Sequence, residues 1–324
     1  MVESKVMTKH IPVLLAETRA MLHLEKGMIV VDATLGGGGH TAMMLSAVAP
    51  GRVIAFDTDG QAIALFGERV ASDPVLSLAS REGRLVVVKR NYSELEAVSQ
   101  ELGIEKVDAI LADLGYSSDQ IEAPDRGLSF QEEGPLDMRL NQETPLTAEI
   151  ILRTYEEDDI VSILLEYGGE HEARRIARAI VAERAIRPIR TTHDLATLIS
   201  SVYPKKKRAT MKIHPATQTF QALRIAVNSE FAHLEEFLVQ AIELLKPGGR
   251  LAVIAFHSGE DIRVKQAFRE AEGACICPPN FPVCQCGQVS RARIITKKPI
   301  GAGEEEIKEN PRARSAKLRI VEKL

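Results

Sequence analysis

Short, nearly uninterrupted apolar runs alternate with helix-like patterns along the first 120 residues of the chain. The apolar runs are rich in β-branched residues and lie at 28–33, 53–56, 85–89 and 107–111. Such runs are typical of strands buried on both faces, and helical patterns between them are typical of a parallel sheet wrapped by helices. The segment therefore predicts an α/β fold.

A fifth run of this kind, at 250–256, comes much later, after a long helical pattern that ends at Lys246-Pro247-Gly248-Gly249. Proline and glycine together are a strong signal that a helix stops. We expect the run at 250–256 to continue the same sheet. Two further runs, at 293–296 and 317–321, predict a last pair of strands that run antiparallel.

The segment from about 125 to 215 differs, because its pattern is helical and holds no convincing strand. Apolar residues recur every three or four positions from Ala173 to Val181, which predicts one helix. The spacing in Thr191-Thr192-His193-Asp194 is that of a capping box and predicts another. The pattern as a whole predicts an α/β domain at 1–124 and 216–324 with a helical domain inserted at 125–215.

Composition excludes several classes of protein. Of the 324 residues, 45% are hydrophobic and 27% are charged, which is typical of soluble globular proteins rather than fibrous, disordered or disulfide-rich chains. No apolar run approaches the ~20 residues of a membrane-spanning helix. The N-terminal residues alternate charged and polar side chains and lack the apolar stretch of a signal peptide. We expect a cytoplasmic protein with no membrane span.

Charge is unevenly distributed along the chain, although its net value is only -4. Between His171 and Pro215 eleven Lys and Arg residues face three acids, and from Arg291 onward ten face five. The remaining chain is therefore strongly acidic. Such segregation is typical of a localised phosphate-binding face and makes RNA a candidate partner. Solvated helix faces are the alternative interpretation.

A glycine-rich turn follows the first predicted strand. Gly36 to Gly39 are four consecutive glycines, and Asp57 follows the second strand, 21 positions after Gly36. Such a turn lets the backbone approach a ligand, and a carboxylate at this place can accept the hydroxyls of an adenosine ribose. The pattern predicts a site for a nucleoside cofactor, and a tight turn with a purely structural role is the alternative.

The spacing of the glycines favours S-adenosylmethionine over a nicotinamide dinucleotide. If the dinucleotide fingerprint started at Gly36, its third glycine would fall at position 41, which is Thr41. S-adenosylmethionine has no pyrophosphate, so a close backbone approach and an acid at the ribose suffice. A nicotinamide-dependent oxidoreductase remains the alternative enzyme, although the chain has no convincing residues for hydride transfer.

The fourth predicted strand ends in Asp113-Leu114-Gly115-Tyr116, at the edge of the sheet where ligands of open α/β folds bind. An acid there can accept a hydrogen bond from an amine and orient its lone pair toward a methyl group. Asp113 is thus the candidate catalytic residue, and Tyr116 could stack on a base. A capped loop and ordinary packing are the respective alternatives. A ring-carbon methylase would need a thiolate, and no cysteine lies near this loop.

Sequence blocks along nearly the whole chain form a pattern known from one protein family. The blocks are His10 to Leu15, Gly36 to His40, Asp113 to Gly115, Arg126 to Phe130, Gly134 to Arg139, His214 to Thr217, Phe220 to Ile225, Phe256 to Ser258 and Asn310 to Ser315. They resemble the RsmH (MraW) family, which has a class I S-adenosylmethionine-dependent methyltransferase fold. The resemblance implies methylation of the exocyclic N4 of a cytidine in the decoding region of small-subunit ribosomal RNA.

The resemblance also implies which residues contact the cofactor. These are Gly38, Gly39, His40, Asp57, Tyr92, Asp113 and Gln120. The chain departs from the family pattern in two places. In the first place, this chain has Tyr116 and Asp119 where the family usually has Val and Pro. In the second, the family has His-Ser-Leu-Glu-Asp, and this chain has Gly259 in place of the leucine. A stacking role for Tyr116 therefore does not follow from the resemblance.

Four residues are candidates for binding the substrate: Tyr116, Arg139, His214 and His257. His257 ends the fifth predicted strand, so it should face the same cleft as Asp113 and could orient the cytosine or its phosphate. A histidine with a purely structural role is the alternative. The substrate itself could be free RNA or the assembled small ribosomal subunit.

The four cysteines form two pairs, Cys275 with Cys277 and Cys284 with Cys286. Two such pairs close together could hold a tetrahedral structural zinc, although this spacing is not the commonest one. Free thiols in a proline-rich loop are the alternative.

A function without catalysis is also possible for the whole chain. A catalytically silent RNA-binding or assembly factor would keep the basic insertion but would need no intact cofactor loop.

Overall fold

The computed structural model describes residues 12–116, 120–121, 123–273 and 289–324. Internal contacts divide the chain into two units, Tyr116–Glu230 and the remainder, Lys9–Gly115 with Phe231–Leu324. The sequence placed the boundaries of the insertion at 125 and 215 instead. The difference at the second boundary arises because helix α12 (Thr217–Asn228) buries Phe220, Leu223 and Val227 in the core of the inserted unit.

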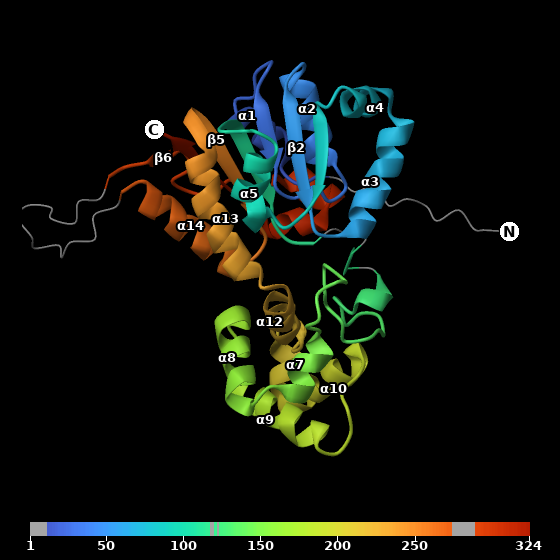
Figure 1. The fold of residues 1–324 in the computed structure, drawn as a ribbon. Helices are drawn as coiled ribbons and strands as arrows, with labels where there is room; N and C mark the ends of the chain where they lie inside the picture. The colour runs from blue at the N-terminus through green and yellow to red at the C-terminus, as the bar shows by residue number, and fades with distance from the viewer. Residues whose placement is uncertain (1–11, 117–119, 122, 274–288) are drawn as a thin grey trace, which may run out of the picture. The chain divides into compact units, whose positions relative to one another are not determined.

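The larger unit is built on a twisted sheet whose strands follow the order β3-β2-β1-β4-β5-β7-β6 (Figure 1). The strands are β1 (Ile29–Asp32), β2 (Arg52–Asp57), β3 (Leu85–Lys89), β4 (Val107–Asp113), β5 (Leu245–Ala255), β6 (Ala292–Ile294) and β7 (Lys317–Lys323). Neighbouring strands from β3 to β5 are parallel, whereas β7 is antiparallel to both β5 and β6. The predicted α/β fold of class I methyltransferases is confirmed.

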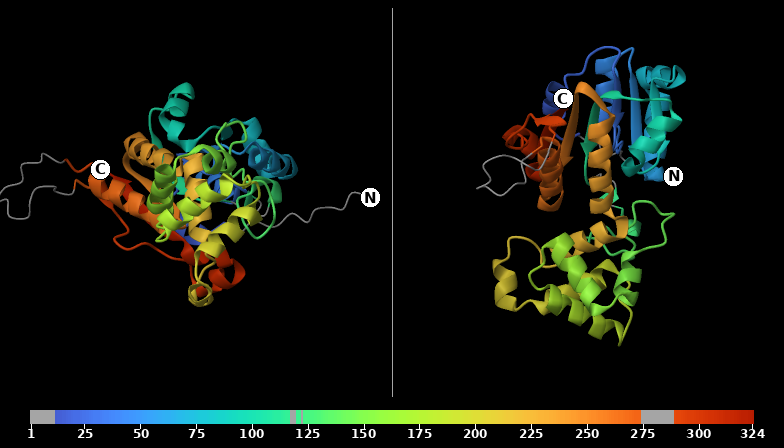
Figure 2. Two further views of the ribbon diagram at one scale, coloured as in Figure 1. Left: turned by 90° about the horizontal axis from the view of Figure 1, so that it is seen from below. Right: turned by 60° about the vertical axis from the view of Figure 1, so that its left-hand side comes forward.

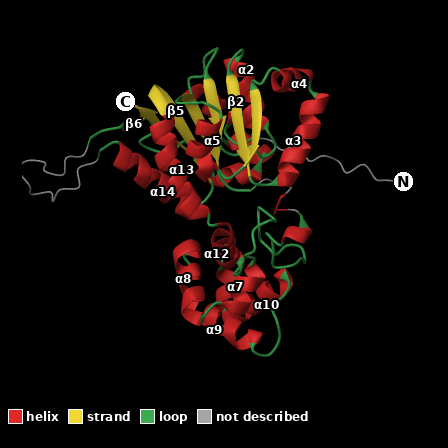
Figure 3. Ribbon diagram, viewed as in Figure 1, coloured by secondary structure: helices red, strands yellow, loops and turns green. Residues whose placement is uncertain are grey.

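Side chains alternate between the two faces of this sheet, because successive residues of a strand point to opposite sides. On one face Val31, Ile110 and Val253 pack in a core with helices α5 (Leu95–Glu101), α13 (Glu230–Leu244) and α14 (Ser258–Ala271). The neighbouring residues of the same strands pack in a second core with α2 (Gly39–Val48), α3 (Gly60–Ser72) and α4 (Pro74–Arg81). Helices thus cover both faces (Figures 2 and 3).

The remaining short elements of the larger unit complete its ends. They are α1 (Leu15–Met21), the turn η1 (Tyr92–Glu94), α15 (Glu304–Glu309) and the turn η3 (Pro311–Ser315). The proline and glycines at 247–249, which predicted the end of a helix before the strand, lie inside β5. Helix α13 ends at Leu244, and β5 begins at Leu245 and not at Arg250. Val107 pairs with Leu245 and Ala109 with Arg250, so the residues between them bulge out of the strand.

The inserted unit is helical and has its own core. After the turn η2 (Pro124–Arg126) its helices are α7 (Ala148–Thr154), α8 (Glu157–Gly168), α9 (Ala173–Arg184), α10 (Thr192–Val202), α11 (Lys205–Thr210) and α12. The predicted stripe on α9 is buried at Ala173, Ile176 and Ile180. The capping box is also confirmed, because Thr191 and Asp194 bond each other's backbone N–H groups.

The sequence analysis also predicted that the chain has no membrane span and that its four cysteines could hold a structural zinc. No helix within 12–116, 120–121, 123–273 and 289–324 has the length and apolar character needed to cross a membrane. Cys275, Cys277, Cys284 and Cys286 lie outside the described residues, so the structural zinc stays a prediction.

A buried ion pair joins α14 to β7 and predicts how the fold responds to acid. Arg319 donates to Asp261 through Nε at 2.6 Å and Nη2 at 3.1 Å, and Lys317 lies 3.3 Å away. Burial alone would raise the pKa of Asp261, but the bonds and charges of Arg319 and Lys317 outweigh it and lower the pKa. The stabilisation is therefore present at neutral pH and is lost as the pH falls through this lowered pKa.

We expect Asp261→Asn to lower the free energy of unfolding by roughly 2–4 kcal/mol at pH 7, because Arg319 then keeps a buried charge without a carboxylate. The measurement is urea unfolding between pH 3 and pH 7, where the difference from the wild type should shrink toward acid. Glu235→Gln, which breaks an exposed pair with Arg263, is the control and should cost less than about 1 kcal/mol. Equal effects of the two variants would contradict the assignment.

Candidate active site

Three aspartates end neighbouring strands at one edge of the sheet. Asp32 is the last residue of β1, Asp57 of β2 and Asp113 of β4. These strands are parallel neighbours in the order β2-β1-β4. Their carboxyl ends therefore meet at the edge where open α/β sheets bind ligands. The sequence analysis predicted Asp57 and Asp113 here but missed Asp32.

The glycine turn between β1 and α2 contains glycines with two different roles. A Cβ on Gly38 would lie 2.1 Å from the ring of Phe66, and one on Gly39 would lie 2.6 Å from Pro12. Packing inside the protein thus requires glycine at both positions. Gly36 has a positive φ of 47°, and a Cβ there would meet nothing within 4 Å. The surroundings of Gly36 therefore leave space for a ligand, whereas those of Gly38 and Gly39 do not.

Asp57 holds the glycine turn against β2. One carboxylate oxygen accepts a hydrogen bond from the N–H of Gly36 at 3.0 Å, and the other accepts from the N–H of Asp59 at 2.9 Å. Burial raises the pKa of Asp57, and the two amide bonds offset part of this rise. Each oxygen can accept more than one hydrogen bond. Asp57 can therefore still accept ribose hydroxyls, and its grip on the turn is a role that the sequence analysis missed.

Asp32 is fully buried and is the centre of a hydrogen-bond network. It accepts from the hydroxyl of Thr41 at 2.6 Å and from the N–H of Thr34 at 3.2 Å. The hydroxyl of Thr34 in turn accepts from the N–H of Asp113 at 2.7 Å. Burial raises the pKa of Asp32 to about 6, although the bond from Thr41 and the charge of His40 act in the opposite direction. The only sequence signal for this role was a carboxylate at the end of a predicted strand.

His40 lies in the first turn of α2, and its Nε2 is 3.5 Å from Oδ2 of Asp113. Both ring nitrogens of His40 and Oδ1 of Asp113 are buried without a hydrogen-bond partner in the described part of the chain. Buried polar atoms usually have partners. The orphaned atoms and the space at Gly36 together fit a polar ligand with a ribose and amine groups, such as S-adenosylmethionine.

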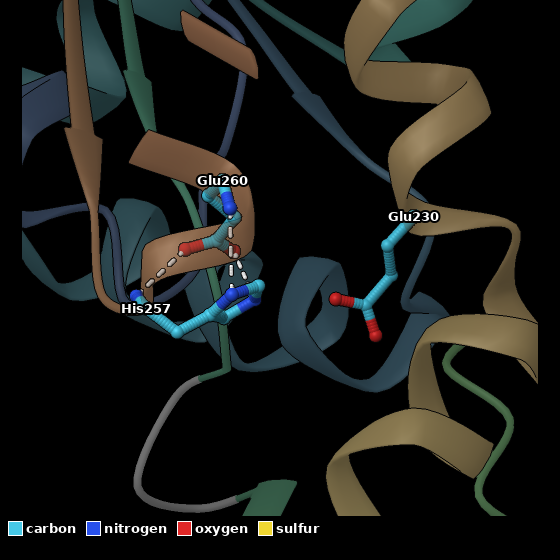
Figure 4. Close-up of side chains that lie close together, drawn as sticks. All are labelled: Glu230, His257 and Glu260. Carbon is cyan, nitrogen blue, oxygen red and sulfur yellow. Dashed lines mark hydrogen bonds and ion pairs between the residues drawn. The ribbon is translucent and has the colours of Figure 1, made fainter. Parts of the chain in front are cut away.

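His257 has a structural role at the start of α14, where Figure 4 shows it beside Glu260. Its Nδ1 accepts from the N–H of Glu260 at 3.4 Å. Glu260 in turn accepts from the N–H groups of Phe256 and His257 at 2.8 and 3.2 Å. This reciprocal arrangement is a capping box. The geometry favours the structural interpretation of His257, and its role in substrate binding stays a prediction.

The other two predicted cofactor contacts lie in different units. Tyr92 follows β3 in the turn η1, half-buried, and its ring packs edge-to-face on Phe237 at 5.1 Å. Gln120 belongs to the inserted unit. Both assignments stay predictions.

Tyr116 belongs to a polar cluster within the inserted unit. Its hydroxyl donates to Glu230 at 2.5 Å and accepts from the side-chain amide of Asn228 at 3.2 Å. The guanidinium of Arg224 lies over one face of the ring, 4.0 Å from its centre. That face of Tyr116 is already covered, so a base could not stack there.

Arg139 and His214 also lie in the inserted unit. Nε and Nη2 of Arg139 bond both oxygens of Asp137, at 2.9 and 2.7 Å. Burial alone would raise the pKa of Asp137, but the hydrogen bonds and charge of Arg139 outweigh burial and lower it, so the pair stays ionised. Nη1 of Arg139 donates to backbone oxygens of its own loop. A phosphate would have to compete with these partners.

The ring of His214 stacks on the ring of Phe130, with 4.6 Å between their centres. His214 is exposed, so it stays accessible to a substrate.

The raised pKa of Asp32 predicts a particular dependence of stability on pH. Because its folded pKa of about 6 exceeds the ordinary value of 3.8, ionising Asp32 costs stability as the pH rises between these values. We expect the stability of Asp32→Asn, measured relative to the wild type by urea unfolding, to increase from pH 4 to pH 6 and then to level off. A difference that stays constant across this window would show that Asp32 does not titrate as proposed.

Comparisons with known proteins agree over almost the whole chain. Residues 7–324 match the MraW methylase family. The ribosomal RNA small subunit methyltransferase H of Carboxydothermus hydrogenoformans is 48% identical over 315 residues, which cover 97% of this chain and 98% of that protein. The protein of the same name from Geobacter sp. is 45% identical over 316 residues, covering 97% and 98%. That from Thermomicrobium roseum is 46% identical over 324 residues, covering 99% and 96%. The chain therefore belongs to the MraW methylase family.

Proposed function

We propose that this protein transfers a methyl group from S-adenosylmethionine to the exocyclic N4 amine of a cytidine in the decoding region of small-subunit ribosomal RNA. The observation that carries the proposal is the edge formed by Asp57, Gly36 and Asp113 in a chain of the MraW methylase family. The names of the relatives support the ribosomal substrate. Such a protein would act in the cytoplasm, where the subunit is present.

Asp57 and Gly36 would hold the nucleoside part of the cofactor. Asp57 has lone pairs left for the ribose hydroxyls after accepting from Gly36 and Asp59. The space above Gly36 lets the ligand approach the backbone. When bound, S-adenosylmethionine supplies an electrophilic methyl group on a positively charged sulfur. The chain itself then has to orient the amine and exclude competing water.

Asp113 would orient the attacking amine. A carboxylate oxygen of Asp113 would accept a hydrogen bond from one N–H of the amine, which would direct the nitrogen lone pair toward the methyl group. Transfer would break the S–CH3 bond of the donor as the N–C bond forms, so the donor would leave as a neutral thioether. The nitrogen would become acidic in the same step, and its proton would pass to Asp113 or to water. No strong base is needed, because proximity and alignment supply most of the acceleration.

Thr41 supports this cofactor over a nicotinamide dinucleotide. It stands where the dinucleotide fingerprint has its third glycine, and its hydroxyl is committed to Asp32. Two further observations favour an enzyme over a catalytically silent RNA-binding factor. The glycine turn is intact and held by Asp57, and the site has buried polar atoms without partners at Asp113. A silent factor would need neither feature.

The inserted unit offers a basic surface for RNA. Lys205, Lys206 and Lys207 lie exposed on α11, and Lys207 pairs with Glu172 at 2.7 Å. Within the described ranges, Lys205 and Lys206 form no ion pair with an acid. Cations that are free in this way can replace the counterions of phosphates. We propose that α11 contacts ribosomal RNA, either free or in the assembled subunit.

Asp113→Ala should lower methyl transfer at least about 100-fold, because the amine loses its orienting acceptor. The assay is transfer of a tritiated methyl group to unmethylated small subunits, followed by mass spectrometry of the nucleosides. Asp158→Ala, an exposed substitution in the inserted unit, is the control. Near-normal turnover of Asp113→Ala would remove Asp113 from the mechanism. A methylated nucleoside other than N4-methylcytidine would overturn the proposed function.

Reversing two charges on α11, Lys205→Glu with Lys206→Glu, should weaken binding to small-subunit RNA. The plot of log Kd against log salt should become shallower by about two, because two phosphate contacts are lost. Binding of S-adenosylmethionine should not change. The matched control is Arg19→Glu with Lys26→Glu, two exposed residues that precede β1. If both double variants lose the same affinity, net charge alone explains the binding and α11 is not the contact.

A further inference from the structure

The basic segment that begins at Arg291 has no role in the site described above. From Arg291 onward ten Lys and Arg residues face five acids, a segregation typical of a phosphate-binding face. In the larger unit, the strands β6 and β7 of this segment pack against α14. Basic residues from these three elements and from the turn after β6 come together there.

A pocket with a volume of about 230 Å³ lies between α14 and these strands. Four cations line it, namely Lys265 and Arg269 of α14, Lys297 after β6 and Arg319 of β7. Among the described residues that line it, Glu272 is the one acid. Sites that enclose a whole small molecule usually measure ~300–1,000 Å³. This α14 pocket is smaller, so it fits one anionic group of a larger ligand.

Three of these cations have no partner of opposite charge. Lys265, Arg269 and Lys297 are exposed, and within the described ranges none of them forms an ion pair. The carboxylate of Glu272 accepts a hydrogen bond from the backbone N–H of Ile294 at 3.1 Å. The α14 pocket therefore presents an excess of positive charge that a bound anion would balance.

The spacing of Lys265 and Arg269 is unfavourable in the free protein. They are four positions apart on α14 and line the same pocket, and like charges at this spacing destabilise a helix. Arg269 lies in the last turn, where the helix dipole favours a cation, but Lys265 lies a turn earlier. An anion between the two side chains would replace this repulsion with attraction to a shared partner.

The buried wall of the α14 pocket has two further hydrogen-bond donors, which are held in place. Arg319 is 8% exposed and donates to Asp261 through Nε and Nη2, which leaves Nη1 without a hydrogen bond in the part of the chain described. The hydroxyl oxygen of Thr296, another lining residue, accepts from the N–H of Ile320 at 2.8 Å, so its own proton is left to donate. A guanidinium held in this way suits the oxygens of a phosphate.

We propose that the α14 pocket binds a phosphate group of the RNA backbone. The three exposed cations supply the charge, and Arg319 and Thr296 supply the fixed donors. The inference rests on the proposed function and adds to it a second RNA contact, on the unit that carries the candidate active site. Such a contact positions the RNA without reading its sequence.

The α14 pocket lies on the same unit as the carboxyl edge of the sheet but apart from it. Asp113 pairs with Ile254 of β5, which pairs with Leu318 of β7, the residue before Arg319. Neighbouring strands lie ~4.8 Å apart, so the backbones of Asp113 and Leu318 are about 10 Å apart. From that level the pocket runs away from the edge along α14. An RNA strand that presents its cytidine at the edge can therefore place a nearby phosphate in the pocket.

The test compares a pocket variant, Lys265→Gln with Lys297→Gln, with a matched control, Lys298→Gln with Lys308→Gln. The control removes two exposed lysines of the basic segment that do not line the pocket. Binding of small-subunit RNA is measured at several salt concentrations without the methyl donor. The pocket variant should bind roughly five- to tenfold more weakly at about 0.1 M salt, and its plot of log Kd against log salt should become shallower by about one, because one phosphate contact is lost. The control should bind as the wild type does.

Two further measurements accompany the binding assay. The Kd for S-adenosylmethionine should not change in either double variant, which shows that both are folded. If thermal unfolding shows that the pocket variant does not fold, Lys297→Gln alone, outside the helix, carries the test. Inorganic phosphate should raise the unfolding temperature of the wild type more than that of the pocket variant, since it binds the folded pocket.

The outcomes separate the inference from the proposed function. Unchanged RNA affinity in the pocket variant would overturn the inference, and a stabilising effect of phosphate would then mean a site for a free anion. Equal losses in the pocket variant and the control would show that net charge and not the α14 pocket explains the binding. A wild-type protein that loses RNA affinity through the pocket variant but methylates no subunit would instead refute the proposed methyl transfer and leave the phosphate contact standing.

Discussion

The buried carboxyl of Asp32 is the interaction on which the geometry of the site depends. It joins the end of β1 to the start of α2 through Thr41 and to the end of β4 through Thr34 and the backbone of Asp113. A buried carboxyl is costly unless it is fully bonded, so these partners have little freedom to move. The network thereby fixes the backbone at Thr41, next to His40, and at Asp113.

The glycine turn shows how one motif serves both packing and binding. Gly38 and Gly39 are glycines because Phe66 and Pro12 occupy the space of their side chains. These contacts bring α2 close to the rest of the second core. Gly36 is held by Asp57, and a Cβ there would meet nothing within 4 Å. The tight packing on one side is what keeps the other side open and rigid.

Several candidate residues prove to have strong partners within the protein. Arg139 donates from Nε and Nη2 to Asp137 and from Nη1 to backbone oxygens of its own loop, and His257 completes a capping box with Glu260. Tyr116 is covered on one face by Arg224. Residue type and position along the chain indicated polar residues of the right chemistry at these places. They did not indicate the competing partners. Asp137 and Glu260 lie two and three positions from Arg139 and His257, where the local backbone geometry brings them together, whereas Arg224 reaches Tyr116 from a distant part of the chain.

The sequence by itself determined the strands of the sheet, the helical character of the inserted unit and two of the three aspartates at the carboxyl edge, Asp57 and Asp113. Apolar runs, stop signals and the capping box at Thr191 depend on local periodicity and local hydrogen bonds, which a single chain displays directly. The tertiary structure decided the start of β5, the extent of the inserted unit and the roles of Asp32, Thr34 and Thr41. Those features depend on strands and helices that meet across large separations in the sequence. Packing decides which groups are buried there and which hydrogen bonds form, and no local stretch of the sequence displays these partners.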